Sequence, residues 1–348
     1  MRRTPVTSIG AAIAAGLFLT ACSESTTEPD VAGAGQVTVN AEATWAYLGF
    51  QGDGLVPVNV VDPALSQVWD IALYGTSVML NGGAAGPGGL EGHCLCQNRG
   101  ATNAQVMAFT AANQRAAFEA IGAAHVPQAD TAWKSDALAP AIAGWYRYDL
   151  ATHTVAAVPE KAFYIRTSEG GAYAKFRVTL IDGATRTSAG RVTFEYALQS
   201  AAGAALGAVQ TRTVEVAASG RVSFDFESGT ATTNGWDIAL EGFVIRVNGG
   251  VSGTGSAGAV AATEPFEAID DPSGAPASVY KGDAFGGVFD SHRWYRYNLT
   301  GTDHQVWPTF DVYLVRKGNS VYKLQLTNYY GAAGEARHIT LRYGQVVP

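Results

Sequence analysis

Hydrophobic and polar residues alternate along many short segments of the chain. In residues 191–196, Val192, Phe194 and Tyr196 share one face of the segment and polar residues occupy the other. The same period of two recurs over 221–227 and again near the C-terminus. This period is typical of β-strands that bury one face. The pattern therefore predicts a mainly β fold of antiparallel sheets with a few short helices.

One Ala-rich segment, residues 103–123, breaks the alternation. A helix over this segment would place six apolar residues on one face, which Asn113 interrupts: Val106, Phe109, Ala116, Ala117, Ala120 and Ile121. We therefore expect an amphipathic helix capped by Thr102 or Asn103. A shorter helix is expected over 263–269, with Thr263 as its cap and Pro265 in its first turn.

Two long parts of the chain repeat each other. The repeated blocks are Trp69-Asp70-Ile71-Ala72-Leu73 with Trp236-Asp237-Ile238-Ala239-Leu240, Asn81-Gly82-Gly83 with Asn248-Gly249-Gly250, and Trp145-Tyr146-Arg147-Tyr148 with Trp294-Tyr295-Arg296-Tyr297. The offset between copies falls from 167 to 149 residues before the last block, so the first copy is longer there by 18 residues. A tandem duplication organises the chain. We expect two successive β domains, 36–202 and 203–348, that meet in the small-residue stretch 200–207.

The N-terminus has the pattern of an export signal. Arg2 and Arg3 precede an apolar run that is too short and too rich in Gly to span a membrane. The run ends in Leu19-Thr20-Ala21-Cys22, which resembles the lipobox of bacterial lipoproteins. This resemblance implies that the signal peptide 1–21 is removed and that Cys22 carries lipid. Residues 22–35 would then be the lipidated N-terminus and a flexible tether to the outer membrane, on its periplasmic face or at the cell surface.

Composition narrows the class of function. The 348 residues include 30 acidic and 23 basic side chains, for a formal net charge of −7. An acidic chain lacks the basic face that nucleic-acid phosphates require. The sequence contains no nucleophile elbow, P-loop, H-E-x-x-H motif or dinucleotide fingerprint. We therefore expect a binding protein and not an enzyme.

The repeated blocks, in their order and spacing behind a lipobox, resemble the HmuY family of haem-binding lipoproteins. The resemblance covers nearly the whole mature chain, twice. It implies an all-β fold with a few short helices, haem bound without a covalent link, and transfer of that haem between a haem-carrying protein and an outer-membrane receptor. It also implies two axial iron ligands, His or Met, from loops between the N-G-G and W-Y blocks. The block tryptophans Trp69, Trp145, Trp236 and Trp294 are expected to be buried scaffold.

Three candidate iron ligands lie between those blocks in the first copy. Haem iron accepts an imidazole, thioether, thiolate or phenolate on its axis. His93 paired with His125 or with Met107 would suit the family pattern. The second copy has no Met or Cys and offers His292, with Tyr280 as a phenolate. We therefore expect haem in the first repeat and loss of binding in the second.

Cys94 and Cys96 leave further functions open. An exported chain meets an oxidising compartment, which favours a disulfide between them. With His93 they also form a three-ligand set of the kind that binds zinc or copper. The alternatives to haem binding are therefore a transition-metal-binding lipoprotein that uses these three residues, and a surface adhesion or interaction module without a cofactor. Met79 is expected in the core, and His153 and His304 in solvated turns.

Overall fold

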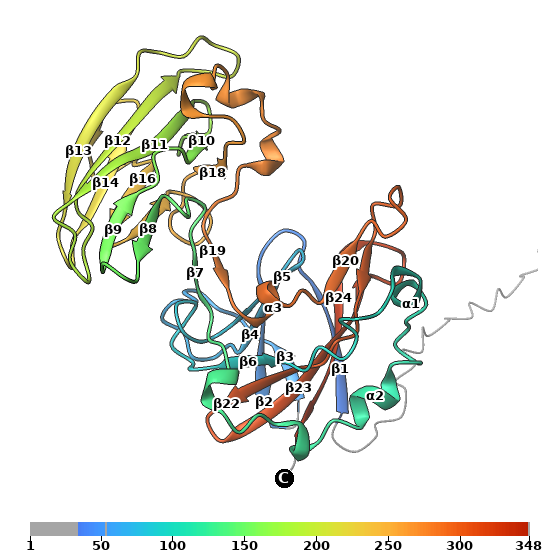
Figure 1. Ribbon diagram of the computed structural model, residues 1–348. Helices are drawn as coiled ribbons and strands as arrows, with labels where there is room; N and C mark the ends of the chain where they lie inside the picture. The colour runs from blue at the N-terminus through green and yellow to red at the C-terminus, as the bar shows by residue number, and fades with distance from the viewer. Residues whose placement is uncertain (1–33, 53, 347–348) are drawn as a thin grey trace, which may run out of the picture.

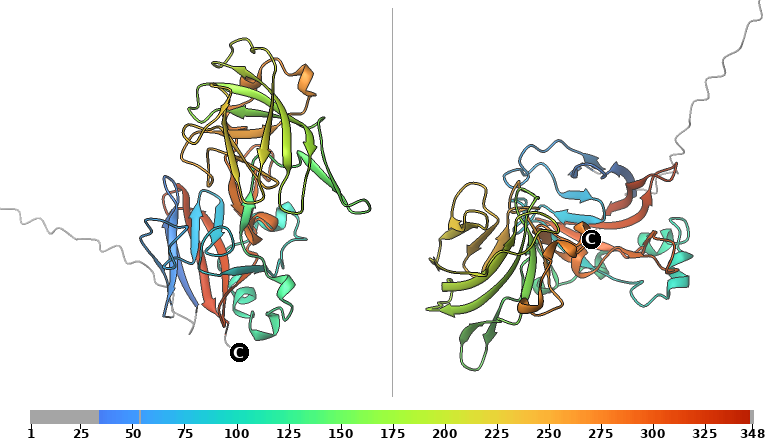
Figure 2. Two further views of the ribbon diagram at one scale, coloured as in Figure 1. Left: turned by 90° about the vertical axis from the view of Figure 1, so that its left-hand side faces the viewer. Right: turned by 90° about the horizontal axis from the view of Figure 1, so that it is seen from above.

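The computed structural model describes residues 34–52 and 54–346, so the signal peptide, Cys22 and most of the tether lie outside the described residues. The described chain forms two β-rich lobes (Figure 1). Lobe A consists of residues 34–136 and 287–346, and lobe B consists of residues 140–283. Two further views show the lobes as separate bodies joined at a narrow waist (Figure 2). The expectation of a mainly β fold with a few short helices is confirmed.

Lobe A packs two antiparallel sheets around one core. The first sheet has the order β1 (Ala34–Asn40), β24 (Ala336–Gln345), β23 (Ser320–Tyr330), β22 (Tyr313–Lys317) and β6 (Glu91–Cys94). The second has the order β3 (Gly54–Pro57), β2 (Ala46–Gln51), β4 (Ile71–Tyr74) and β5 (Ser77–Leu80). Around them lie the hairpin β20 (Tyr295–Tyr297) and β21 (Val306–Pro308), the helices α1 (Asn103–Met107), α2 (Arg115–Glu119) and α3 (Val288–Ser291), and the 3-10 turns η1 (Ala123–His125) and η2 (Asp130–Ala132).

Lobe B repeats this plan. Its larger sheet has the order β13 (Gln210–Val216), β12 (Gly190–Gln199), β11 (Tyr173–Asp182), β10 (Ala162–Arg166) and β18 (Gly258–Ala261). The second sheet has the order β15 (Thr230–Ala231), β14 (Arg221–Asp225), β16 (Ile238–Glu241) and β17 (Val244–Val247). The hairpin β8 (Tyr146–Asp149) and β9 (Thr154–Ala157) and the 3-10 turns η3 (Phe266–Ala268), η4 (Pro272–Gly274) and η5 (Ala277–Val279) complete it. The expected alternation is confirmed, because Val192, Phe194 and Tyr196 are all buried.

The two repeats exchange halves between the lobes. In lobe A, β1 and β6 of the first repeat pair with β24 and β22 of the second. In lobe B, β18 of the second repeat pairs with β10 of the first. Figure 1 shows the exchange as colour, because lobe A combines the blue and red ends of the chain while lobe B holds its middle. The chain passes between the lobes along β7 (Ala137–Ala139) and β19 (Ala284–Gly286), which pair antiparallel with each other.

This exchange differs from the expected domain division at 202/203. Residues 200–207 connect β12 to β13, two neighbouring strands of one sheet, and the Gly207 amide donates to the Leu198 carbonyl at 2.8 Å. A hairpin connection of this kind lies within a lobe and not between lobes. Each expected domain, 36–202 or 203–348, contains half of lobe A and half of lobe B. The repeat marks two copies of a sequence, but it does not show which halves pack together.

The N-G-G blocks form the tight loops beside the waist. Gly83 and Gly250 have φ values of +60° and +65°, a region that favours glycine. A Cβ on Gly250 would also lie 2.0 Å from the Asp283 carbonyl oxygen, so the crossing segment packs directly on this glycine. The preceding asparagine holds each loop, since the Asn248 side chain donates to the Trp236 carbonyl at 2.8 Å. These contacts explain why the block occurs in both repeats.

The expected helices are shorter in the structure. Residues 103–123 form two separate helices, α1 and α2, although Thr102 caps the first through a capping box as expected. The Asn113 side chain accepts from the Thr110 amide at 2.9 Å and donates to the Ala108 carbonyl at 2.9 Å, and this local turn replaces the middle of the expected helix. Three alanines of the expected apolar face, Ala116, Ala117 and Ala120, are exposed. Over residues 263–269 the chain forms the 3-10 turn η3 in place of the expected helix, with Pro265 and not Thr263 at its N-cap.

The expected burial of the block tryptophans holds for three of the four. Trp69, Trp145 and Trp294 are at most 2% exposed, and Met79 is buried as expected. Trp236 is half-buried and stacks under the Arg221 guanidinium at 4.3 Å from the ring centroid. The loop before Trp236 is shorter than the one before Trp69, whose Nε1 donates to the Pro63 carbonyl. The shorter loop leaves part of the second indole uncovered.

Candidate functional site

The exchange of halves brings the candidate iron ligands of both repeats into one lobe. His93, Met107 and His125 of the first repeat and His292 of the second all lie in lobe A. Residues 140–283, which make up lobe B, contain one histidine, His153, and no Met or Cys. A site with two axial ligands of the usual types is therefore available in lobe A alone.

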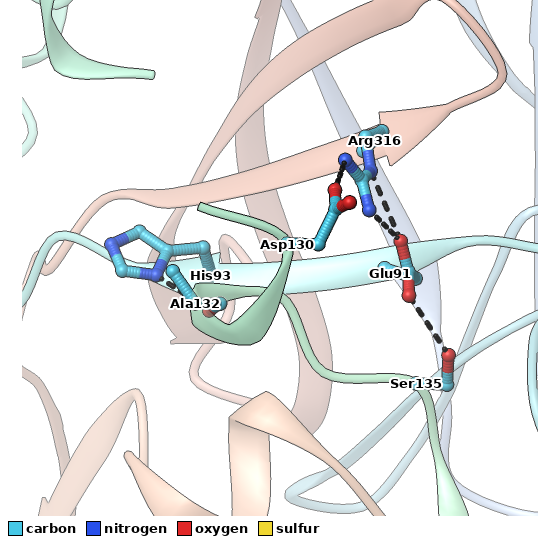
Figure 3. Close-up of polar contacts among 6 residues, drawn as sticks. All are labelled: Glu91, His93, Asp130, Ala132, Ser135 and Arg316. Atoms are coloured by element: carbon cyan, nitrogen blue, oxygen red, sulfur yellow. Dashed lines mark hydrogen bonds and ion pairs between the residues drawn. The ribbon is translucent and has the colours of Figure 1, made fainter. Parts of the chain in front are cut away.

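His93 has the geometry of a metal-binding histidine. It lies half-buried on β6, and its Nδ1 is 2.9 Å from the Ala132 carbonyl oxygen. A carbonyl only accepts, so Nδ1 carries a proton, and in the neutral imidazole Nε2 has the lone pair. Figure 3 shows the second ring nitrogen pointing away from Ala132. A backbone carbonyl on one nitrogen commonly orients the other nitrogen of an imidazole toward a metal.

Ion pairs hold the segment that orients His93. Arg316 of the second repeat donates from Nε to Glu91 Oε2 at 3.0 Å and from Nη1 to Asp130 Oδ1 at 2.8 Å (Figure 3). Glu91 begins β6, and Asp130 begins η2, which carries Ala132. The Arg316 guanidinium thus joins the strand that carries His93 to the turn whose carbonyl accepts the hydrogen bond from His93. The buried Trp133 lies beside them, with its ring 6.1 Å from the imidazole.

His292 follows α3 and lies in the same lobe as His93. Desolvation lowers the pKa of His292, and the Arg99, Lys134 and His93 side chains lower it further. The imidazole is therefore neutral at neutral pH. Its Nδ1 lies 3.3 Å from Arg99 Nη1, and because a guanidinium only donates, this nitrogen accepts. Arg99 thus donates a hydrogen bond to the lone pair on Nδ1 of His292. Within the described part of the chain, His93 Nε2 receives no such hydrogen bond.

A cavity of about 240 Å³ opens beside His292. Its lining includes Cys96, Arg99, His292, Arg293, Arg296 and Asp311. Three guanidinium groups around one hollow suit carboxylates, which arginine binds through paired hydrogen bonds. Asp311 is 6% exposed and accepts from the Asn98 amide at 2.8 Å, and burial raises the pKa of its carboxyl.

Cys94 and Cys96 are joined in a disulfide. Neither sulfur is then a thiolate, the form that binds metals. The imidazole near the pair is that of His292, whose donor atom and both sulfurs lie within 4.8 Å of one another. His93 is the strand neighbour of Cys94, and neighbours on a strand point to opposite faces. The structure therefore does not assemble the expected metal set of His93, Cys94 and Cys96.

The remaining expected residues lie elsewhere. His125 is exposed at the end of η1 with Nδ1 3.3 Å from the Gly122 amide, and Met107 is half-buried on α1. Among the described residues, no hydrogen bond or ring contact joins either side chain to His93. Tyr280 is buried in lobe B and donates to the Pro272 carbonyl, and burial raises its pKa to about 12, so a phenolate there is disfavoured. His153 and His304 are exposed turn residues as expected.

Comparison with known families identifies the class of protein. The family model described as HmuY protein matches residues 41–196 and 218–343. The chain therefore belongs to the HmuY family, and the two matched segments confirm the tandem repeat. No curated protein matches the chain. Within the described residues, no helix combines the length and apolar character needed to cross a membrane.

Two crystal structures are similar to the chain at low identity. One, described as a lipoprotein of Bacteroides fragilis, is 13% identical, and the match covers 92% of this chain and 95% of that chain with a TM-score of 0.35. The other, described as an HmuY-like heme binding protein of Bacteroides vulgatus, is 16% identical, and the match covers 37% of this chain and 86% of that chain with a TM-score of 0.19.

Proposed function

We propose that this protein is an exported lipoprotein that binds haem without a covalent link in lobe A, for capture or for transfer to an outer-membrane receptor, and that it is not an enzyme. Membership of the HmuY family supports this proposal. The observation that carries it is the imidazole of His93, which has Nδ1 fixed on the Ala132 carbonyl and Nε2 free to bind iron.

His292 is the second ligand in this proposal. It is a neutral imidazole contributed by the other repeat, and it lies beside Cys94 and Cys96, on the face of β6 opposite to His93. Because β6 is the edge strand of its sheet, both imidazoles lie at that edge. Iron would displace Arg99 from its ring nitrogen, and the released guanidinium would join Arg293 and Arg296 in binding the haem propionates. The pairs of His93 with Met107 or His125 remain alternatives that mutation distinguishes.

Lobe B takes no haem in this proposal. It offers His153, an exposed turn residue bonded to the Tyr148 hydroxyl at 2.7 Å, and no second His and no Met or Cys. The protein should therefore bind one haem per chain, although it contains two copies of the family sequence. Lobe B would serve in docking or as a spacer.

Titration of the mature protein with haemin, followed by its Soret band, tests the proposal. We expect saturation at one haem per chain and the spectrum of a low-spin iron with two nitrogen ligands. His93→Ala should lose this spectrum and most of the affinity, and His292→Ala should give a single-ligand form. His153→Ala in lobe B is the matched control and should bind as the parent protein does. Absence of saturable binding, or equal binding by His93→Ala, would favour an interaction module without a cofactor.

A further inference from the structure

The two lobes differ at one corner, although the residues there occupy equivalent positions in the two repeats. Asp70 and Asp237 occupy the same position in the two W-D-I-A-L blocks, and both are at most 1% exposed. Asp70 Oδ2 accepts from the Phe50 amide at 2.7 Å, and Asp237 Oδ2 accepts from the Phe226 amide at 2.9 Å. The strand pairing of β2 with β4 and of β14 with β16 makes these two phenylalanines equivalent.

The residues flanking that phenylalanine carry different charges in the two lobes. Lobe A has Gly49 and Gln51 on either side of it, and lobe B has Asp225 and Glu227. Lobe A therefore has one carboxylate at this corner and lobe B has three. The carboxylate oxygens of the lobe B group lie within 4.8 Å of one another.

The cation that balances the lobe A carboxylate is missing from lobe B. Lys317 Nζ lies 2.9 Å from Asp70 Oδ2. On β22, Arg316 precedes Lys317 and pairs with Glu91 of β6. On β10, Arg166 precedes Thr167 and pairs with Gly258 of β18, the equivalent of Glu91 in the second repeat. Thr167 therefore takes the place of Lys317. Lobe B thus gains two carboxylates and loses the ammonium group at the same corner.

The Thr167 hydroxyl points into this acidic group. Thr167 is 0% exposed, and its Oγ1 has no hydrogen-bond partner. Its side chain starts from the register position that carries the Lys317 side chain in lobe A, and the amide of the next residue, Ser168, donates to Asp237 Oδ1 at 2.6 Å. A buried oxygen without a partner costs free energy unless a ligand satisfies it.

We infer that lobe B binds a calcium ion at this corner, in the place that the Lys317 ammonium fills in lobe A. The protein ligands are oxygens of Asp225, Glu227, Asp237 and Thr167. Calcium takes six to eight oxygen ligands, including carboxylates and waters, and tolerates irregular geometry. Glu227 is exposed, so water can complete the coordination shell from that side. This inference does not depend on haem, because the haem proposal concerns lobe A.

Calorimetric titration of the chelator-treated mature protein with calcium chloride tests the inference. We expect one calcium per chain and a higher melting temperature when calcium is present. Glu227→Gln should weaken binding by at least roughly tenfold, because a ligand charge is lost. Thr167→Lys should abolish binding and remove the effect of calcium on melting, because it supplies the ammonium group of lobe A. Glu160→Gln, an exposed acidic residue of the same lobe, makes the same change of net charge and should bind as the parent does.

Two outcomes would overturn the inference. One is the absence of saturable binding up to about 5 mM calcium, a concentration that fills even weak extracellular sites. The other is unchanged affinity in both Glu227→Gln and Thr167→Lys. Circular dichroism checks that each variant folds, and Asp225→Asn, on a half-buried residue, replaces Thr167→Lys if that variant does not fold. Haemin titration of the same samples separates this result from the haem proposal.

Discussion

Lys317 Nζ lies 2.9 Å from Asp70 Oδ2, and the two residues belong to different repeats. The Asp70 side chain is 2% exposed and that of Lys317 is 38% exposed. The pair therefore neutralises a buried carboxylate from the edge of the lobe. It forms only when the first half of one repeat packs against the second half of the other, so it depends on the exchange that builds lobe A.

Removing this lysine should destabilise lobe A. Lys317→Met leaves the buried Asp70 carboxylate with the Phe50 amide and without its cation. We expect a loss of about 1–3 kcal/mol in the free energy of unfolding, less than for a fully buried pair because Lys317 is partly exposed. Urea denaturation measures the loss. Lys281→Met, on an exposed lysine, should change stability by no more than about 0.5 kcal/mol, and equal losses in the two variants would contradict the prediction.

A buried carboxyl at the waist makes stability depend on pH. Desolvation raises the pKa of Asp136 from 3.8 to about 7, the Leu80 amide opposes the rise, and Asp290 adds to it. The folded protein therefore holds a proton that the unfolded chain releases near pH 4. The contribution of Asp136 to the free energy of unfolding is highest below that pH and falls as the pH rises toward about 7, by up to about 4 kcal/mol in total.

Replacing Asp136 by asparagine should flatten this dependence. The amide introduced at this position would be neutral at all pH values, as the protonated carboxyl is, so Asp136→Asn should gain stability relative to the parent at about pH 8 and not at about pH 4. Urea denaturation across this range measures the difference. Asp270→Asn, which changes an exposed carboxyl of lobe B, is the control. A parallel shift of the Asp136→Asn curve at every pH would show that the carboxyl does not titrate in this range.

Lobe B should fold as an independent fragment. Its core comes from one continuous stretch, and the Ala141 amide donates to Asp283 Oδ1 at 2.8 Å, which joins the two ends of that stretch. We expect fragment 140–283 to give a near-ultraviolet circular dichroism spectrum and to unfold cooperatively. Fragment 36–202, the first repeat, should not, because it contains half of each core. Cooperative unfolding of 36–202 as a monomer would show that a repeat can also fold on itself.

The disulfide should control zinc binding in lobe A. Reduction of Cys94 and Cys96 would release two thiols beside the neutral imidazole of His292. Two thiolates and one imidazole are a usual set of protein ligands for zinc. We expect one zinc per chain after treatment with a phosphine reductant and none before it, measured by elemental analysis after gel filtration. His292→Ala should remove the zinc and His125→Ala should not. Equal zinc content with and without reductant would contradict this prediction.

Local features were accessible from the sequence because they depend on near neighbours. The alternation in 191–196 predicts the buried face of β12, and Thr102 predicts the cap of α1. The helix expected over 103–123 was wrong because Asn113 makes a competing turn with its own backbone neighbours. The burial of Trp236 was wrong for a different reason, since it depends on the length and packing of the loop that precedes it.

The candidate site was only partly accessible from the sequence. Elimination among the histidines and methionines leaves His93, Met107 and His125 in the first repeat, and the structure fixes Nδ1 of His93 on the Ala132 carbonyl. The presence of His292 in the same lobe as His93 could not be predicted, because the two residues are 199 positions apart and belong to different repeats. An even longer stretch of chain, 247 positions, separates the carboxylate of Asp70 from its cation on Lys317.

By itself the sequence determined the β class, the duplication and the set of residues that can bind iron, since alternation, repetition and side-chain chemistry are all local properties. Only the tertiary structure decided which half-repeats pack together. Two copies of one pattern offer equivalent strand partners, so packing within a repeat and packing between repeats satisfy the same hydrogen bonds and the same apolar faces. In the structure the halves pack between repeats, and the chain crosses between the lobes along the paired strands β7 and β19. That packing places His93 and His292 in one lobe and leaves the three carboxylates of lobe B without a lysine.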